Sequence, residues 1–266
     1  NTAWAFSTIE VSDFELFQAV AENSIGKLTS FTAQDKANTV WALAKQDHLH
    51  LPFMDAVAVE SLRSIAEYTQ QHISNISWAF AKLLVHNTSL MNMFCGKIHK
   101  EIDQAQAQTL SRMAWSLARL ALRDPTFLAS ISKAAQQRLP QFGAQEIANT
   151  SWAFGMMVIA DVALFNSLAA SAMDALPSFL VVHVSNTLWA FAAVAMMPTS
   201  DKVARFLDSV SSAALSKITV FGSQSLSATA WSLAKLVLRN EELLEAISAQ
   251  CVLKVETFAP QNLANT

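Results

Sequence analysis

The amino-acid sequence predicts an all-α chain. We expect an α-solenoid of about seven two-helix repeats of 37 residues, wound into a right-handed superhelix. Few breakers interrupt the 266 residues, since there are five glycines, six prolines and no Asn-Gly or Asp-Gly hairpin pair. The strongest signal is the spacing of the seven tryptophans, with gaps of 37 residues and a last gap of 42: Trp4, Trp41, Trp78, Trp115, Trp152, Trp189 and Trp231.

The composition favours packed helices over membrane spans. Hydrophobic residues make up 52% of the chain and charged residues 15%, which is apolar for a soluble protein. The longest apolar stretches, near residues 152–165 and 189–197, are broken by Asp161 and Pro198. No run therefore reaches the roughly 18 residues of a membrane helix. We expect the apolar excess to fill interfaces between repeats, with no membrane insertion.

Charge, cysteines and motifs exclude several kinds of site. The formal net charge is −3, so a nucleic-acid site would have to be a local stripe. Cys95 and Cys251 stand in different repeats and form neither a zinc spacing nor a disulfide framework. The histidines do not repeat at metal-ligand spacing, and no nucleophile elbow, phosphate loop or carboxylate pair appears. We expect no catalytic residue, no metal and no cofactor, hence no enzyme.

The predicted array occupies residues 1–266 as a single domain, with a repeat ending near each tryptophan. The chain begins at Asn1 and stops at Thr266, both inside the repeated motif. We therefore expect it to be a segment of a longer array.

Each repeat is predicted to hold two helices. In the repeat that ends at Trp78, the first helix runs from about Pro52 to Tyr68 with apolar residues at i, i+3 and i+4. The second carries the tryptophan over about fifteen residues, as in Ala33–Asp47 and Ala144–Ala160. An aromatic ten residues before the tryptophan marks the link in most repeats: Phe31, Tyr68, Phe142, Phe179 and Phe221.

The connections between repeats also carry signals. Asp13, Asp124 and Asp161 recur nine residues after a tryptophan and are predicted to be turn or capping acids. The long gap before Trp231 holds five extra residues, which we place in the turn around Met197–Val203 because loops absorb insertions at small entropic cost.

Helical positions at about 100° per residue divide the second helix into faces. The residues two after and five before the tryptophan, such as Phe80 and Ile73, fall together and should pack on the first helix. The tryptophan lies opposite, between small residues, and should pack on the next repeat as structural core. A base-stacking platform is the less favoured alternative. We expect Trp115→Ala to cost about 3–5 kcal/mol.

A polar stripe remains, predicted to face the concave groove of the solenoid. It holds the residues six and three before the tryptophan, the one after it, and the one four after it, for example Asp35, Asn38, Ala42 and Lys45. Candidates for reading bases are Asp35, Asn38, His72, Asn75, Thr109, Arg112, Glu146, Asn149, His183, Asn186 and Ser225. Candidates for contacting phosphate are Lys45, Lys82, Arg119 and Lys235.

Other interpretations of these columns stay open. The Asn amides could bond to a neighbouring helix backbone, or could hold an extended peptide as armadillo-type grooves do. The basic column could be a solvated face, and the variable column six before the tryptophan could be surface drift.

The repeat resembles the octotricopeptide repeat. The resemblance rests on Leu139–Phe154 and on the core segments Lys36–Lys45, Ser74–Leu83, Ser111–Leu120 and Ser227–Leu236. Related arrays are those of mitochondrial proteins with FAST-kinase-type domains and of RNA-editing substrate-binding complexes. The period of 37 and the acidic net charge depart from that family's pattern.

The resemblance implies an α-solenoid that binds single-stranded RNA in the mitochondrial matrix or in plastids such as chloroplasts. It implies a role in transcript stability, processing, editing or translation, with other RNA-processing proteins as partners. The alternative is a scaffold that holds an extended peptide or a partner repeat in the same groove.

Overall fold

The structure is a computed structural model that describes residues 2–197 and 201–265. All regular structure in these ranges is helical, in agreement with the predicted all-α class. Two kinds of helix alternate along the chain. The first kind comprises the tryptophan helices and α15, which holds the same place in the repeat: α1 (Thr2–Thr8), α3 (Ala33–Lys45), α5 (Gln70–Lys82), α7 (Ala107–Arg119), α9 (Ala144–Met156), α11 (Val181–Ala193), α13 (Ser223–Lys235) and α15 (Pro260–Asn265).

The second kind comprises the partner helices, each followed by a three-residue 3-10 helix. The partner helices are α2 (Phe14–Ile25), α4 (Leu51–Arg63), α6 (Thr88–Lys100), α8 (Pro125–Arg138), α10 (Val162–Ala175), α12 (Asp201–Ser216) and α14 (Glu241–Lys254). The 3-10 helices are η1 (Leu28–Ser30), η2 (Ile65–Glu67), η3 (Ile102–Gln104), η4 (Leu139–Gln141), η5 (Leu176–Ser178), η6 (Ile218–Val220) and η7 (Val255–Thr257).

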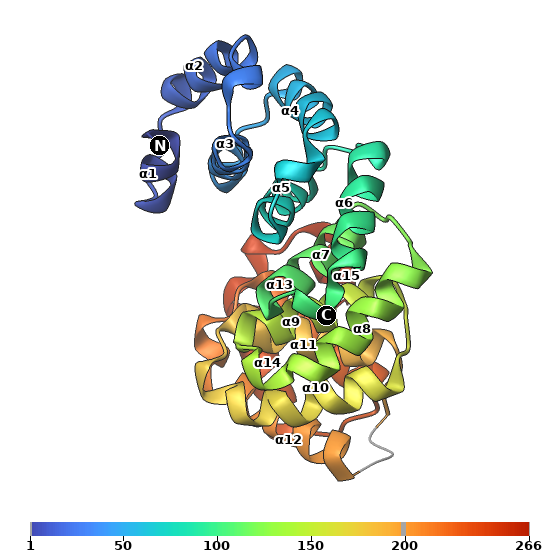
Figure 1. Cartoon of the computed structure of the whole chain (residues 1–266). Coiled ribbons are helices and arrows are strands. Elements are labelled where there is room, and N and C mark those ends of the chain that lie inside the picture. Colours follow the sequence, from blue (N-terminus) through green and yellow to red (C-terminus); the bar gives the residue numbers. More distant parts are fainter. Residues whose placement is uncertain (1, 198–200, 266) are drawn as a thin grey trace. The chain divides into compact units, whose positions relative to one another are not determined.

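The chain divides into two compact units, residues 1–131 and 132–266, with the boundary inside α8. In the first unit, α1, α3, α5 and α7 pack in sequence as one row, and α2, α4 and α6 follow along its side (Figure 1). In the second unit, α9, α11, α13 and α15 form the row, and α10, α12 and α14 pack beside it. This stacking of neighbours agrees with the predicted solenoid, while its superhelical hand and the single array over 1–266 stay predictions.

The helices begin and end where capping chemistry allows. The tryptophan helices have 13 residues in α3, α5, α7, α9, α11 and α13, two fewer than we expected. Each partner helix other than α12 follows a polar residue that stands nine after a tryptophan. Asp13, Asp124 and Asp161 accept the N–H of Leu16, Phe127 and Leu164 at 3.0 Å, which confirms them as caps.

Each tryptophan helix ends in a left-handed residue six positions after the tryptophan. The seven residues have φ between 52° and 59°, and none is a glycine: Glu10, Asp47, Leu84, Ala121, Val158, Ala195 and Val237. The N–H of the residue that follows donates a hydrogen bond to the carbonyl of the residue two after the tryptophan, for example Val85 to Phe80 at 2.8 Å. This 6→1 bond is the Schellman motif, which satisfies a terminal carbonyl and turns the chain toward the partner helix.

The core lies between the two rows. Phe80 and Ile73 on α5 are fully buried, as are Phe53 and Phe94 on the partner helices. Each such side chain contributes roughly 1.5–3 kcal/mol by leaving water. The predicted face of the tryptophan helix toward its partner helix is therefore confirmed. One repeat departs from it, since Lys36 takes the aliphatic position in α3 and lies buried with its ammonium 6.0 Å from the centre of the Tyr68 ring.

The prediction that the tryptophans form the buried core is wrong. The indoles of Trp41, Trp78, Trp115, Trp152, Trp189 and Trp231 are only partly buried, and Trp4 is 45% exposed. The side packed on the next repeat lies farther round the helix, at the small residue three after the tryptophan. Ser7 donates its hydroxyl to the carbonyl of Ala42 at 2.9 Å, and a β-carbon on Gly155 would lie 2.8 Å from the Cα of Ala190.

The residue just after the tryptophan is also not in a polar stripe. Ala42, Ala79, Ala153 and Ala190 are completely buried. Ala42 and Ala190 contact the residue three after the preceding tryptophan, because a helix inside a stack has neighbours on two opposite sides. Sequence reasoning counted only one of these neighbours.

The extra residues before Trp231 fall partly outside the described residues, at 198–200. Of the described part, α12 has 16 residues against 12 to 14 in the other partner helices. Some of the insertion therefore lengthens a helix, and the prediction of a longer turn was incomplete.

Candidate functional site

Four columns of each tryptophan helix remain open to solvent. They are the residues seven and three before the tryptophan, the tryptophan itself and the residue four after it. Spacings of four, three and four place them within about 60° of helix circumference. In α5 these are Gln71, which is exposed, and Asn75, Trp78 and Lys82, which are partly buried. We call these four columns the tryptophan face.

The indoles of successive repeats form a ladder along this face. Ring centroids are 6.4 Å apart for Trp41 and Trp78, and 6.5 Å for Trp78 and Trp115. In the second unit, Trp189 and Trp231 are 6.3 Å apart. Interplanar angles of 30° to 33° are similar in these three pairs. The paired rings contact one another and leave part of each indole at the surface.

The column three before the tryptophan supplies amides beside the ladder. Asn38, Asn149 and Asn186 are partly buried, and none bonds through its side chain to another described residue. In α7 the position is Arg112, whose guanidinium donates to the amide oxygen of Asn75 in the preceding repeat. One alternative from the sequence was a hydrogen bond between the Asn side-chain amide and the backbone of a neighbouring helix. That hydrogen bond is absent at Asn38, Asn149 and Asn186.

The basic column is unequal between repeats. Lys45 lies 3.2 Å from Glu10, and Lys82 lies 3.1 Å from Asp47, so two of the four cations are paired with a carboxylate of the preceding repeat. The Lys82 ammonium also lies 5.7 Å from the centre of the Trp78 ring. The two carboxylates belong to Glu10 and Asp47, which are the left-handed residues at the ends of α1 and α3.

The other two basic residues have no such partner. Leu84 and Ala195 take the left-handed position in the repeats before Arg119 and Lys235. Both cations are exposed and have no carboxylate within 4 Å among the described residues. A phosphate approaching the tryptophan face would therefore meet Arg119 and Lys235 as unshielded charges.

The column six before the tryptophan, our candidate for base discrimination, serves as a helix cap in four repeats. Asp35 accepts the Thr32 N–H at 3.0 Å and the Thr32 hydroxyl at 2.6 Å. These bonds lower the pKa of Asp35 below its ordinary value. Glu146 accepts the Gly143 N–H at 3.1 Å.

Two histidines do the same with an imidazole nitrogen. His72 Nδ1 accepts the Thr69 N–H at 3.4 Å, and His183 Nδ1 accepts the Leu180 N–H at 3.2 Å. Burial lowers the pKa of both histidines, although Glu146 opposes the shift at His183. The neutral ring, which can accept the bond, is therefore favoured.

The remaining members of that column are also engaged. Thr109 is buried, and Ser225 accepts the hydroxyl of Ser185 at 3.2 Å. The structure thus brings the Asn and basic candidates together on the tryptophan face and places the capping side chains at its edge.

Sequence reasoning missed the glutamine column seven before the tryptophan. These side chains are exposed: Gln34, Gln71, Gln108, Gln145, Gln224 and Gln261, with Val182 in the same position of α11. Its signal was present in the repeat alignment, because six of these seven positions carry the same residue.

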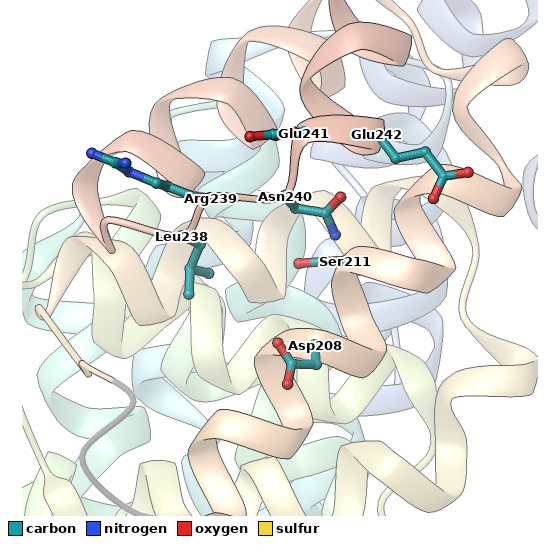
Figure 2. Close-up of a pocket in the computed structure, with 7 residues that line it drawn as sticks. All are labelled: Asp208, Ser211, Leu238, Arg239, Asn240, Glu241 and Glu242. Atoms are coloured by element: carbon teal, nitrogen blue, oxygen red, sulfur yellow. The ribbon is translucent and has the colours of Figure 1, made fainter.

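Cavities also open beside the helices of both units. One of about 480 Å³ opens beside α1 and α3 and includes Trp4, Asp35 and Asn38 in its lining. The other, of about 430 Å³, lies between α12 and the start of α14 (Figure 2). Asp208, Glu241 and Glu242 line it, with Arg239 as the only cation among its lining residues. Its carboxylates disfavour an anionic ligand.

Among residues 2–197 and 201–265, no three His, Cys, Asp or Glu side chains gather as metal ligands. In the same ranges, no helix combines the length and the apolar character needed to cross a membrane.

Comparison with known proteins gives a family. No curated protein matches the chain. The family model described as RNA-editing substrate-binding complex 6 protein matches residues 45–266, which include five of the seven tryptophans. The match supports the predicted relation to RNA-editing substrate-binding complexes, while the octotricopeptide assignment stays a prediction. Because the match covers more than half of its residues, this chain belongs to the RNA-editing substrate-binding complex 6 protein family.

Proposed function

We propose that this chain binds single-stranded RNA along the tryptophan face and acts as a binding component in RNA editing inside an organelle, the mitochondrial matrix or a plastid. The observation that carries the proposal is the stacking of partly exposed indoles within each compact unit, Trp41 to Trp115 in the first and Trp189 with Trp231 in the second, flanked by free amides and cations. The family description, which names an RNA-editing substrate-binding complex, supports it. In this proposal the chain supplies binding, and other proteins carry out the editing chemistry.

Each component of the face suits one part of an unpaired nucleotide. Indole rings offer apolar surface to bases that are not stacked in a duplex. The amides of Asn38, Asn149 and Asn186 can donate and accept hydrogen bonds at base edges. The unshielded cations Arg119 and Lys235 suit phosphate oxygens. Duplex RNA is a poorer ligand, because its base edges and faces are already occupied.

The test is a titration of the purified chain with fluorescein-labelled single-stranded RNA at two salt concentrations. We expect affinity to fall as salt rises, because phosphate contacts release counterions. Arg119→Ala together with Lys235→Ala should lower the slope of log K against log salt by about 1.4, that is about 0.7 for each single-strand contact.

A matched control removes the same charge outside the face. Arg123 and Arg239 are exposed and each lies four residues beyond its counterpart. The Arg123→Ala, Arg239→Ala double variant should keep the wild-type salt slope. Absence of RNA binding, or the same loss from both double variants, would contradict the proposal.

A peptide-binding scaffold is the second candidate. The pairing of Lys45 and Lys82 with carboxylates favours it, since two of the four basic positions are already neutralised. An extended peptide held by Asn amides and indoles would bind with little dependence on salt. The two-salt titration therefore separates the candidates.

A further inference from the structure

The glutamine column is the part of the tryptophan face that has no structural task. Gln71 and Gln145 are exposed in the first turn of α5 and α9, and neither side chain bonds to a described residue. A surface amide that supports neither a cap nor the core can turn freely toward a ligand. Its repetition in α3, α5, α7, α9, α13 and α15 gives one such amide in most repeats.

Each glutamine stands four residues before the Asn column and seven before the tryptophan. Side chains at i, i+4 and i+7 are neighbours on one helix face. Gln71 thus lies beside Asn75 and Trp78, and Gln145 lies beside Asn149 and Trp152. A base resting against the edge of Trp152 would have two amides within reach, each with an acceptor oxygen and a donor nitrogen. Beside Trp78, Gln71 offers both groups and Asn75 offers its donor nitrogen, because the Asn75 oxygen accepts from Arg112.

The column six before the tryptophan has the opposite character. Its side chains hold the first turn of the helix, with Asp35, Glu146 and His183 each accepting a backbone N–H at 3.0 to 3.2 Å. Turning one of them toward RNA would expose an unpaired helix-terminal donor, which costs about 0.5–2 kcal/mol.

We propose that the Gln and Asn columns together read the base edges of the bound RNA, repeat by repeat. This inference rests on the proposed function and names its specificity-determining residues. Paired amides recognise an edge that offers an acceptor beside a donor, and adenine is the base they match best. Repeats with both amides, α3, α5 and α9, discriminate between bases, whereas α11, with Val182, and α13, with Ala228, do so weakly.

The experiment selects RNA from a pool with a randomised single-stranded region, using the whole chain, and sequences the bound fraction. Gln71→Ala and Gln145→Ala should each lower the enrichment of the preferred base at one position by about fivefold or more. Affinity for the unselected pool should change by less than about twofold, because phosphate contacts supply most of it. Val182→Gln should add a preference at the position facing α11.

The control variants replace a residue of the column six before the tryptophan but keep its hydrogen bond to the first turn of the helix. Asp35→Asn and Glu146→Gln keep an oxygen acceptor at the helix start, and both should leave the selected sequence unchanged. Preferences that follow the capping variants and ignore the glutamine variants overturn the inference while the proposed function stands. If the wild-type chain binds all RNA sequences equally, the inference is likewise overturned while the proposed function stands. Failure of the wild-type chain to bind any RNA overturns both.

Discussion

The ammonium of Lys82 lies 3.1 Å from the carboxylate of Asp47 and 3.3 Å from the carbonyl oxygen of Lys45. One cation of the tryptophan face is thus held by the helix end of the preceding repeat. The pair is largely solvent-exposed on the acidic side, since the Asp47 side chain is 76% exposed. It contributes little to stability, about 0–1 kcal/mol, but it masks a charge at the proposed phosphate contact.

Asp47→Asn should therefore strengthen RNA binding and raise the salt slope by about 0.7, the value of one added phosphate contact. Asparagine tolerates the left-handed backbone at this position, so the turn is preserved. The measurement is the same two-salt titration. Asp55→Asn on the exposed side of α4 is the matched control and should change neither quantity. Equal gains from both variants would show a general charge effect.

The left-handed helix ends store removable strain. Leu84 has φ of 56° and is 51% exposed, and a residue with a β-carbon costs roughly 1–2 kcal/mol there. Leu84→Gly should raise the free energy of unfolding by about 0.5–1 kcal/mol, after the greater unfolded-state entropy of glycine is subtracted.

Urea unfolding followed by circular dichroism measures this effect. Val59→Gly replaces another exposed aliphatic residue, inside α4, and should instead lower stability by about 0.5 kcal/mol. A loss of stability in both variants would contradict the strain at residue 84.

Two glycines in helices should respond to alanine in opposite ways. A β-carbon on Gly155 would lie 2.8 Å from the backbone Cα of Ala190, so α9 and α11 would have to separate. Gly155→Ala should cost about 1–3 kcal/mol. A β-carbon on Gly96 would meet nothing within 4 Å, so Gly96→Ala should add about 0.5–1 kcal/mol by helix propensity. Thermal unfolding of both variants gives the comparison, and equal effects would refute the close approach.

The tryptophans should matter less for stability than the phenylalanines near them. Trp78 is partly buried, so Trp78→Ala removes less buried area than truncation of a completely buried aromatic and should cost about 1–3 kcal/mol. Phe80→Ala, from a completely buried position, should cost about 3–5 kcal/mol. Trp115 is also partly buried, so the expected cost of Trp115→Ala falls from the roughly 3–5 kcal/mol expected from the sequence to about 1–3 kcal/mol. Denaturant midpoints will rank the variants, and the reverse order would place the indole in the core.

The histidine caps should make stability depend on pH. Burial lowers the pKa of His72 and His183 in the folded state below the unfolded value near 6.5. Protonation therefore favours unfolding. The stabilisation is present above about pH 6.5 and is lost as the pH falls through the folded pKa.

His183→Gln keeps an acceptor for the Leu180 N–H but cannot titrate. Urea midpoints measured from pH 7.5 down to pH 5 should fall less steeply for this variant than for the wild-type chain. An unchanged pH dependence would show that the imidazole cap does not contribute.

Much of the fold could be predicted from the sequence. The tryptophan period predicted the repeats, and the i, i+3 and i+4 apolar pattern predicted both helices and the face between them. The acids at Asp13, Asp124 and Asp161 predicted the caps, because capping depends on residues only three apart in the chain. These features are local, so one repeat contains the information that determines them.

The site depended on contacts between repeats. The arc left open on a tryptophan helix is what remains after the partner helix and two neighbouring repeats have covered the rest. Only the stack shows that Ala42 is buried by the preceding repeat and that Trp41 is not. The sequence by itself determined the repeat, its helices and their caps. Tertiary packing decided which residues face solvent, and so turned the tryptophans from presumed core into the centre of the proposed RNA-binding face.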